Sequence, residues 1–213
     1  MSKSFQLNYC QGNTVTPIPS KQLYLMTLTT PTMNNIYFSK LLVTKQVFYK
    51  SKYTYALVNL KPLVPGHVLI VPLNTNILNI SDLSPKESTD YFRTLQIIHR
   101  FIKWYYKADS LNIAIQDGPE AGQSIPHLHT HIIPRYKLNN IGDKIYDKLD
   151  AWNARRECYV NADGRNGRKK HGIVENYDSP RVPRSEEEMY KEALELGNSL
   201  ESFLEEHPEL NDY

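Results

Sequence analysis

The feature that most constrains this chain is residues 127–131, which read His-Leu-His-Thr-His. His127, His129 and His131 therefore occupy alternate positions. In an extended chain alternate side chains face the same way, so the three imidazoles would share one face. The Leu, Thr and Ile residues that alternate with them would then pack against apolar material on the other face. The pattern predicts a half-buried strand over 127–133.

An irregular segment precedes this strand. Residues 116–126 contain glycine and proline at positions that neither a strand nor a helix tolerates well, so we expect a loop. Backbone amides in such a loop can bind an anion. The expected geometry is a row of imidazoles beside an anion-binding loop.

Three interpretations of the histidine row compete. The first is structural, because most histidines are satisfied surface or core residues. The second is a zinc site, since neutral imidazoles at alternate positions can converge on one ion. The third is catalysis, in which one imidazole acts as the nucleophile and its neighbours supply protons or positive charge.

Composition bounds the class of protein. The chain has 213 residues, of which 40% are hydrophobic, enough for one domain with a core and some appendages. We see no apolar run long enough to cross a bilayer and no signal peptide. The two cysteines, Cys10 and Cys158, lack the spacing of a disulfide framework and suit a reducing compartment. We therefore expect a soluble intracellular protein.

Charge is unevenly distributed along the chain. The net charge is +2, but residues 1–81 contain seven lysines and no acidic residue. A basic half is typical of proteins that bind nucleic acid or phosphorylated small molecules. Because no aromatic-interleaved RNA-binding pattern accompanies the lysines, we favour a polyphosphate ligand and consider nucleic acid an unlikely partner.

Periodicity and turn residues predict an α+β arrangement. A first long helix should begin at Ser84, with Pro85 in its first turn and Glu87 closing a capping box. A second, acidic helix is expected over 185–206, again with a Ser-x-x-Glu capping box. The expected apolar stripe of the first helix is Tyr91, Phe92, Leu95, Ile98, Ile102 and Tyr105. The expected strands are 46–50, 53–59, 67–72, 111–116 and 127–133.

Several motifs together resemble a known family. The run His127-Leu128-His129-Thr130-His131-Ile132-Ile133 fits the histidine triad pattern, and the flanking segments 116–123 and 134–135 narrow the likeness. Segments 56–59 (Ala-Leu-Val-Asn), 61–69 (Lys-Pro-Leu-Val-Pro-Gly-His-Val-Leu) and 184–189 (Arg-Ser-Glu-Glu-Glu-Met) agree with it. The chain resembles the fragile histidine triad branch of the histidine triad (HIT) superfamily, the dinucleoside triphosphate hydrolases.

The resemblance implies an α+β, HIT-like fold, with an antiparallel sheet of about five strands and two main helices. It also implies a homodimer in which two sheets join edge to edge. We divide the chain into a flexible N-terminal extension (1–34), a HIT domain (35–150), a mobile basic insertion (151–183) and a C-terminal acidic helix that packs on the domain (184–213).

The activity implied is hydrolysis of dinucleoside polyphosphates, chiefly diadenosine triphosphate to AMP and ADP. His129 would be the nucleophile and form a nucleotidyl-histidine, the carbonyl of His127 would fix its tautomer, and His131 would lie near the phosphate oxygens. The other residues implied to bind nucleotide are Asn59, His67, Gln116, Gly122, Gln123, Ser124 and Ile125, and Tyr146 is a candidate residue of a substrate loop.

Divalent metal, Mg²⁺ or Mn²⁺, would arrive with the polyphosphate, because no cluster of carboxylates offers a site fixed by the protein. We expect a cytoplasmic protein, with the nucleus as a second location. A mitochondrial location is weakly supported, since residues 1–34 are poor in acids but lack arginine.

Two alternatives stay open. In one, the chain is a nucleotide-binding signalling module whose substrate complex is the active form. In the other, the triad binds zinc. The activity of a sister branch, cleavage of AMP from amines, is disfavoured by the loop 116–123 and by Pro134-Arg135.

Overall fold

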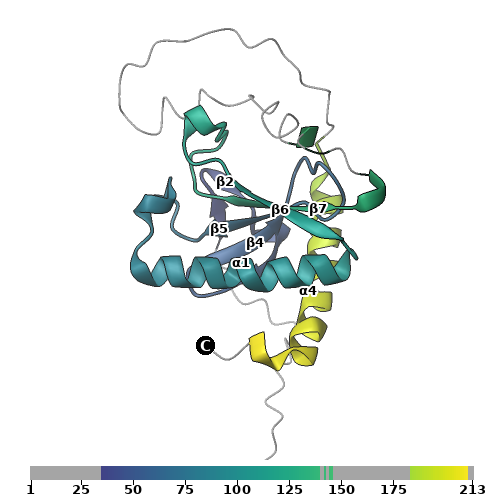
Figure 1. Cartoon of the computed structure of the whole chain (residues 1–213). Coiled ribbons are helices and arrows are strands. Elements are labelled where there is room, and N and C mark those ends of the chain that lie inside the picture. Colours follow the sequence, from purple (N-terminus) through teal and green to yellow (C-terminus); the bar gives the residue numbers. More distant parts are fainter. Residues whose placement is uncertain (1–34, 140–141, 143, 146–182, 211–213) are drawn as a thin grey trace, which may run out of the picture. The chain divides into compact units, whose positions relative to one another are not determined.

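The computed structural model describes residues 35–139, 142, 144–145 and 183–210. Five strands form one antiparallel sheet in the order β3-β4-β5-β7-β6 (Figure 1). The strands are β3 (Val47–Lys50), β4 (Thr54–Val58), β5 (Val68–Pro72), β6 (Ser110–Ile115) and β7 (Thr130–Arg135). The expected α+β class, sheet and helices are confirmed. The expected N-terminal extension, and all of the basic insertion but Pro183, lie outside the described residues.

The triad strand begins later than the sequence predicted. β7 starts at Thr130, so only His131 of the three histidines lies within a strand. The amide of Leu128 donates to the carbonyl of Ile77, 2.8 Å away, which lies outside the sheet. Because that amide is directed away from the neighbouring strands, the ladder starts two residues further on. The prediction of a strand from residue 127 was wrong in this respect.

The first long helix is α1 (Pro85–Tyr105). Ser84 caps it, and the side chain of Glu87 completes the predicted capping box. The predicted stripe was partly wrong: Phe92 is 45% exposed, whereas Phe101 is fully buried. The buried face of the helix consists of Tyr91, Thr94, Ile97, Ile98, Phe101 and Ile102. The helix is thus turned so that Thr94 and Phe101 face the core and Phe92 lies at the surface.

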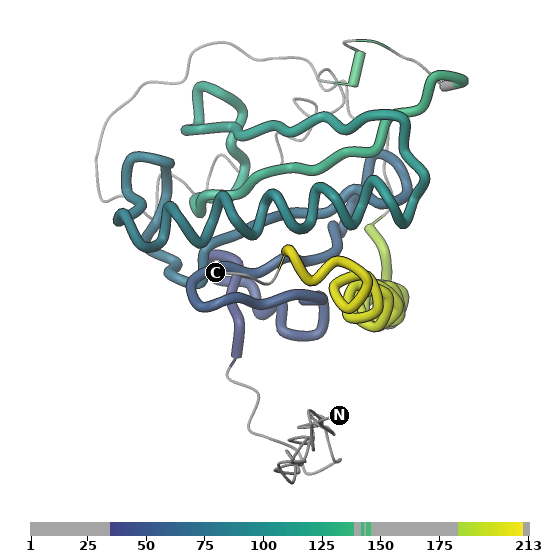
Figure 2. Tube along the Cα trace, turned by 60° about the horizontal axis from the view of Figure 1, so that its bottom comes forward, coloured from purple at the N-terminus to yellow at the C-terminus, as the bar shows by residue number. Residues whose placement is uncertain are grey.

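The second helix, α4 (Glu186–Glu206), has the predicted cap at Ser185 and buries one apolar stripe. The buried members of that stripe are Met189, Ala193, Leu196, Leu200 and Phe203. Both helices contribute to one apolar cluster with the inward side chains of β4, β5 and β7, so they cover the same face of the sheet (Figure 2). No helix in the described ranges is long and apolar enough to cross a membrane.

The opposite face of the sheet is covered by a short hairpin near the start of the described chain. Its strands are β1 (Tyr37–Phe38) and β2 (Leu41–Leu42). Phe38 packs with side chains of β4, β5 and the loop before β7 in a second apolar cluster. Single-turn 3-10 helices complete the described chain: η1 (Thr44–Gln46), η2 (Ile80–Asp82), η3 (Pro119–Ala121), η4 (Lys137–Asn139) and η5 (Pro208–Leu210).

Candidate active site

Four histidines meet where β5 and β7 run side by side. His131 lies on β7 and pairs with Leu69 of β5, while His67 comes immediately before β5. His127 and His129 lie in the segment that leads into β7. All four side chains are at most 2% exposed. The sequence therefore brings the predicted histidines together in one buried group.

His129 is held in a single tautomer. Its Nδ1 lies 2.8 Å from the carbonyl oxygen of His127. A carbonyl oxygen can only accept, so Nδ1 carries the proton and Nε2 keeps its lone pair. Burial lowers the pKa of His129, against a smaller opposing effect of the His127 carbonyl. The side chain is therefore a neutral imidazole at pH 7 with a nucleophilic Nε2, as its proposed role requires.

The carbonyl of His127 is itself fixed by Gln123. The Gln123 amide donates to this carbonyl at 3.2 Å and to the carbonyl of Leu78 at 2.9 Å. Its oxygen accepts from the amide of Gly118 at 3.1 Å. Gln123 thus ties the glycine loop to the oxygen that orients His129. A contact with phosphate, as the resemblance implies, would require it to exchange one of these bonds, and stays a prediction.

A hydrogen-bonded relay fixes the protons of His67 and His131. The amide of Leu63 donates to His67 Nδ1 at 3.1 Å, so the His67 proton lies on Nε2. That nitrogen is 2.9 Å from His131 Nδ1 and donates to it. The proton of a neutral His131 is therefore placed on Nε2. A backbone amide thus determines which nitrogen of His131 can donate.

His127 is held by the main chain of the β1–β2 hairpin. The amide of Ser39 donates to its Nδ1 at 3.0 Å. The ring of Phe38 lies 5.6 Å from the His127 ring and 5.2 Å from the His129 ring, centroid to centroid. Burial, with a smaller effect of His129, lowers the pKa of His127 to about 4. Phe38 and Ser39 were not predicted to be part of the site, because they stand in no recognisable motif.

The glycine loop is less open to an anion than the sequence suggested. The amides of Gly122 and Gln123 donate to the carbonyls of Pro119 and Gly118, each at 3.1 Å. Gly122 adopts the left-handed conformation that ends η3, with φ of 88°. In this structure the two amides close a turn, and their contact with phosphate stays a prediction. Ser124 and Ile125, which follow, are 7% and 5% exposed, and Ile125 belongs to the second apolar cluster.

Asn59 and Gln116 lie at the ends of strands. Asn59 directly follows β4, is 4% exposed, and accepts from the amide of Lys61 at 3.0 Å. Its amide nitrogen is 3.2 Å from His67 Nε2, but that nitrogen carries a proton, so Asn59 is its neighbour and not its donor. Gln116 follows β6 and is half-buried. Tyr146, the expected residue of a substrate loop, lies outside the described residues.

In the described part of the chain, no group of three or more histidine, cysteine or acidic side chains could hold a metal ion. Within the histidine group, the Nδ1 atoms of His127, His67 and His131 accept hydrogen bonds, and that of His129 donates one. Hydrogen bonds at these nitrogens thus orient the four rings.

The arrangement defines a class of site: a buried neutral imidazole with one unprotonated ring nitrogen, oriented by a carbonyl and flanked by further imidazoles. Comparison with known proteins identifies the protein family. The sequence pattern of the HIT domain matches residues 41–138. The bis(5'-adenosyl)-triphosphatase of Saccharomyces cerevisiae is 59% identical over 201 residues, which cover 84% of this chain and 98% of the yeast protein.

Two further relatives agree. The bifunctional bis(5'-adenosyl)-triphosphatase/adenylylsulfatase FHIT of Arabidopsis thaliana is 43% identical over 110 residues, covering 50% of this chain and 59% of that protein. The crystal structure of Plasmodium falciparum diadenosine triphosphate hydrolase in complex with cyclomarin A superposes with a TM-score of 0.55 at 28% identity, covering 81% of this chain and 86% of that one. The chain therefore belongs to the histidine triad family, in its fragile histidine triad branch.

Proposed function

We propose that this protein hydrolyses dinucleoside polyphosphates, chiefly diadenosine triphosphate to AMP and ADP. The observation that carries the proposal is the bond between His129 Nδ1 and the His127 carbonyl, because it leaves Nε2 with a lone pair in a buried imidazole. The relatives named as bis(5'-adenosyl)-triphosphatases support the choice of substrate.

The reaction would proceed in two displacements. His129 Nε2 attacks the phosphorus next to one adenosine, a P–N bond forms, and the P–O bond to the leaving ADP breaks. Water then attacks the same phosphorus, breaks the P–N bond and releases AMP with the imidazole restored. Each displacement is easier than direct attack of water on the polyphosphate.

His131 would assist the first displacement. The relay from Leu63 through His67 places its proton on Nε2. A donor at that nitrogen would stabilise the charge that develops on the phosphate oxygens as ADP leaves. A divalent ion, Mg²⁺ or Mn²⁺, would accompany the polyphosphate and neutralise part of its charge, as hard cations do with phosphate oxygens.

The test is a brief incubation with labelled diadenosine triphosphate followed by an alkaline quench. We expect an acid-labile, base-stable adenylyl adduct on His129 and a loss of turnover of at least about 10⁴-fold in His129→Asn. The matched control is His207→Asn, which makes the same replacement at the end of α4 and should turn over normally. Normal hydrolysis by His129→Asn would refute the mechanism.

A second candidate function is a signalling module in which the bound nucleotide is the output. The depth of burial of the histidines favours long-lived complexes, since a ligand that reached them would be largely enclosed. His129→Asn separates the two functions, because it should keep binding while losing turnover. A cellular effect that survives this substitution would identify the complex as the output.

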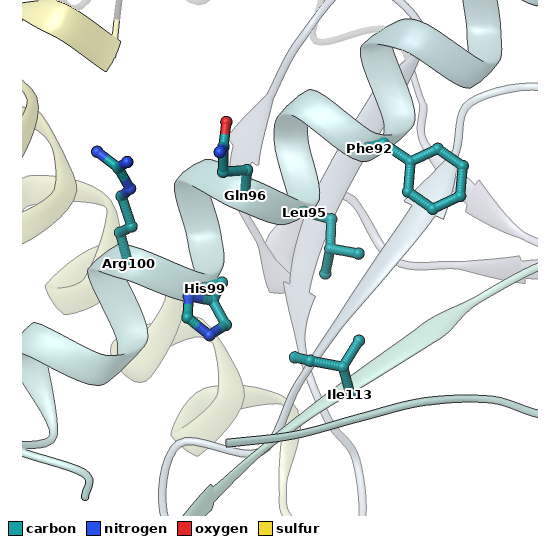
Figure 3. Close-up of a pocket in the computed structure, with 6 residues that line it drawn as sticks. All are labelled: Phe92, Leu95, Gln96, His99, Arg100 and Ile113. Carbon is teal, nitrogen blue, oxygen red and sulfur yellow. The ribbon is translucent and has the colours of Figure 1, made fainter. Parts of the chain in front are cut away.

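We also propose that two copies pair along β6. This strand is at the edge of the sheet. Ile113 on it is 40% exposed and Phe92 on the adjacent α1 is 45% exposed. Together with Leu95 and His99 they line a hollow between the helix and the strand (Figure 3). The edge strand of the described sheet, next to exposed apolar side chains, is the surface that a symmetric partner would cover.

A further inference from the structure

The loop that joins β4 to β5 supplies the backbone amide from which the hydrogen-bonded relay of the site begins. It runs from Asn59 to Gly66 and carries Leu63, whose amide donates to His67 Nδ1. If the loop moved, Leu63 would lose this bond, and both tautomers of His67 would become available. The position of His131's proton would no longer be determined. The question is therefore what holds the loop.

Arg184 holds the beginning of the loop. Its Nε donates to the Asn59 carbonyl at 3.1 Å, and its Nη2 donates to the same oxygen. Its backbone amide donates to the carbonyl of Leu60 at 3.0 Å. The arginine is 125 residues further along the chain than Asn59, immediately before the cap of α4. The residue that precedes the N-terminal cap of α4 is thus hydrogen-bonded to the start of the loop.

Glu192 and Tyr106 hold the end of the loop. Arg184 forms an ion pair with Glu192, and both side chains are only about one-fifth exposed, at 22% and 21%. Glu192 also accepts from the hydroxyl of Tyr106 at 3.1 Å. The ring of Tyr106 covers Gly66 so closely that a Cβ there would lie 2.6 Å from its Cδ2. One network of three side chains therefore contacts both ends of the loop.

We propose that Arg184 is a positioning residue, which holds the Asn59–Gly66 loop in the geometry that fixes the protons of His67 and His131. It would act on turnover through the loop, without touching the substrate. The kinetic part of this inference rests on the proposed hydrolysis. The spectroscopic part rests only on the hydrogen bonds described above.

The test compares Arg184→Met with Arg93→Met. Arg93 is a matched control. Its Nη2 donates to the backbone carbonyl of Leu210 at 2.6 Å, so it also joins the C-terminal region to the rest of the domain, but away from the site. Both variants should lose some thermal stability. Only Arg184→Met should lower kcat, by about tenfold to a hundredfold, since small misplacements of catalytic groups have effects of this size.

The decisive readout is the ¹⁵N spectrum of the histidine rings, recorded below the melting temperature of each variant. The wild type should show single tautomers with the proton on Nε2 at His67 and His131. Arg184→Met should show averaged signals at both, while Arg93→Met keeps the wild-type pattern. Arg184→Lys should restore the pattern in part, because a lysine keeps the charge but not the paired contact with one carbonyl.

Unchanged ring signals in folded Arg184→Met would overturn the proposal, whatever happens to kcat. So would the same averaging in Arg93→Met, because the effect would then be one of general stability. If Arg184→Met does not fold, Arg184→Lys and Glu192→Gln provide the comparison. If the wild type fails to hydrolyse diadenosine triphosphate, the proposed function fails, and the ring spectra still decide the role of Arg184.

Discussion

Gly66 lies so close to the ring of Tyr106 that adding one methyl group, in Gly66→Ala, tests this contact. Its φ is 81°, where side chains are strained, and a Cβ would approach the ring to 2.6 Å. We expect Gly66→Ala to lower the free energy of unfolding by about 3 kcal/mol, the sum of strain and overpacking. Chemical denaturation measures it.

The control for this substitution is Gly142→Ala. Gly142 also has a positive φ, 54°, but no atom of the residues that the structure describes lies within 4 Å of the position of its Cβ. This variant should lose only about 1 kcal/mol, the cost of the backbone conformation. Equal losses in the two variants would show that the ring of Tyr106 moves aside without cost.

His127 should make stability depend on pH. Burial lowers the pKa of its imidazole from 6.5, the ordinary value of a histidine, to about 4 in the folded protein, so the unfolded chain binds more protons between these values. Stability is complete above about pH 6.5 and falls as the pH decreases toward 4. We expect a loss of about 2 kcal/mol between pH 7 and pH 5, with His129 adding to it in the same direction.

Urea unfolding at the two pH values measures this effect. His127→Asn removes the titrating group and should show a distinctly smaller difference between pH 7 and pH 5. A wild type that is equally stable at both would show that the pKa of His127 is the same in the folded and the unfolded state. That result would contradict the lowering of its pKa by burial.

The sequence predicted the histidines of the site but not the residues that orient them. His127, His129 and His131 stand in a recognisable motif, and Pro-Gly before His67 marks a fourth. Phe38, Ser39 and Arg184 reach the site from segments far from it in the chain, through backbone amides, carbonyls and ring contacts. No spacing reveals such contacts, because they depend on how the elements pack.

At the scale of elements, α4 contains a glycine that packing does not require. Gly197 lies within the helix, and a Cβ there would meet the Phe48 carbonyl at 3.5 Å, an ordinary contact. We therefore expect Gly197→Ala to raise the free energy of unfolding by about 0.5–1 kcal/mol, because alanine favours the helix and restricts the unfolded chain. Gly197→Leu should be destabilising, since a larger side chain has no room beside Phe48.

Thermal and chemical unfolding of the two variants measure these changes. A loss of stability in Gly197→Ala would mean that α4 lies closer to β3 than the structure has it. The capping boxes of both long helices were predictable, since Ser-x-x-Glu is a local signal. The rotation of α1 was not, because its stripe contains more apolar residues than the sheet can cover, and Phe92 is left outside.

At the scale of the whole molecule, the proposed pairing along β6 predicts that the protein has the mass of a dimer in solution. We expect Ile113→Lys to convert a dimer into a monomer in sedimentation equilibrium, because a charged side chain would replace an apolar one on the surface that the partner covers. Leu194→Lys is the matched control, since Leu194 is 49% exposed on α4, and it should leave the mass unchanged. A wild type that sediments as a monomer at high concentration would refute the pairing.

The hairpin near the start of the described chain has a consequence for mutational scans. Ser39 has a φ of 55°, and it is its amide, not its hydroxyl, that bonds to His127. Alanine at this position would keep the amide, so a scan of side chains would record it as tolerant. Proline, which has no amide hydrogen and cannot adopt this φ, would release the ring. The arrangement of these rings thus depends in part on a backbone amide, a group that every amino acid except proline supplies.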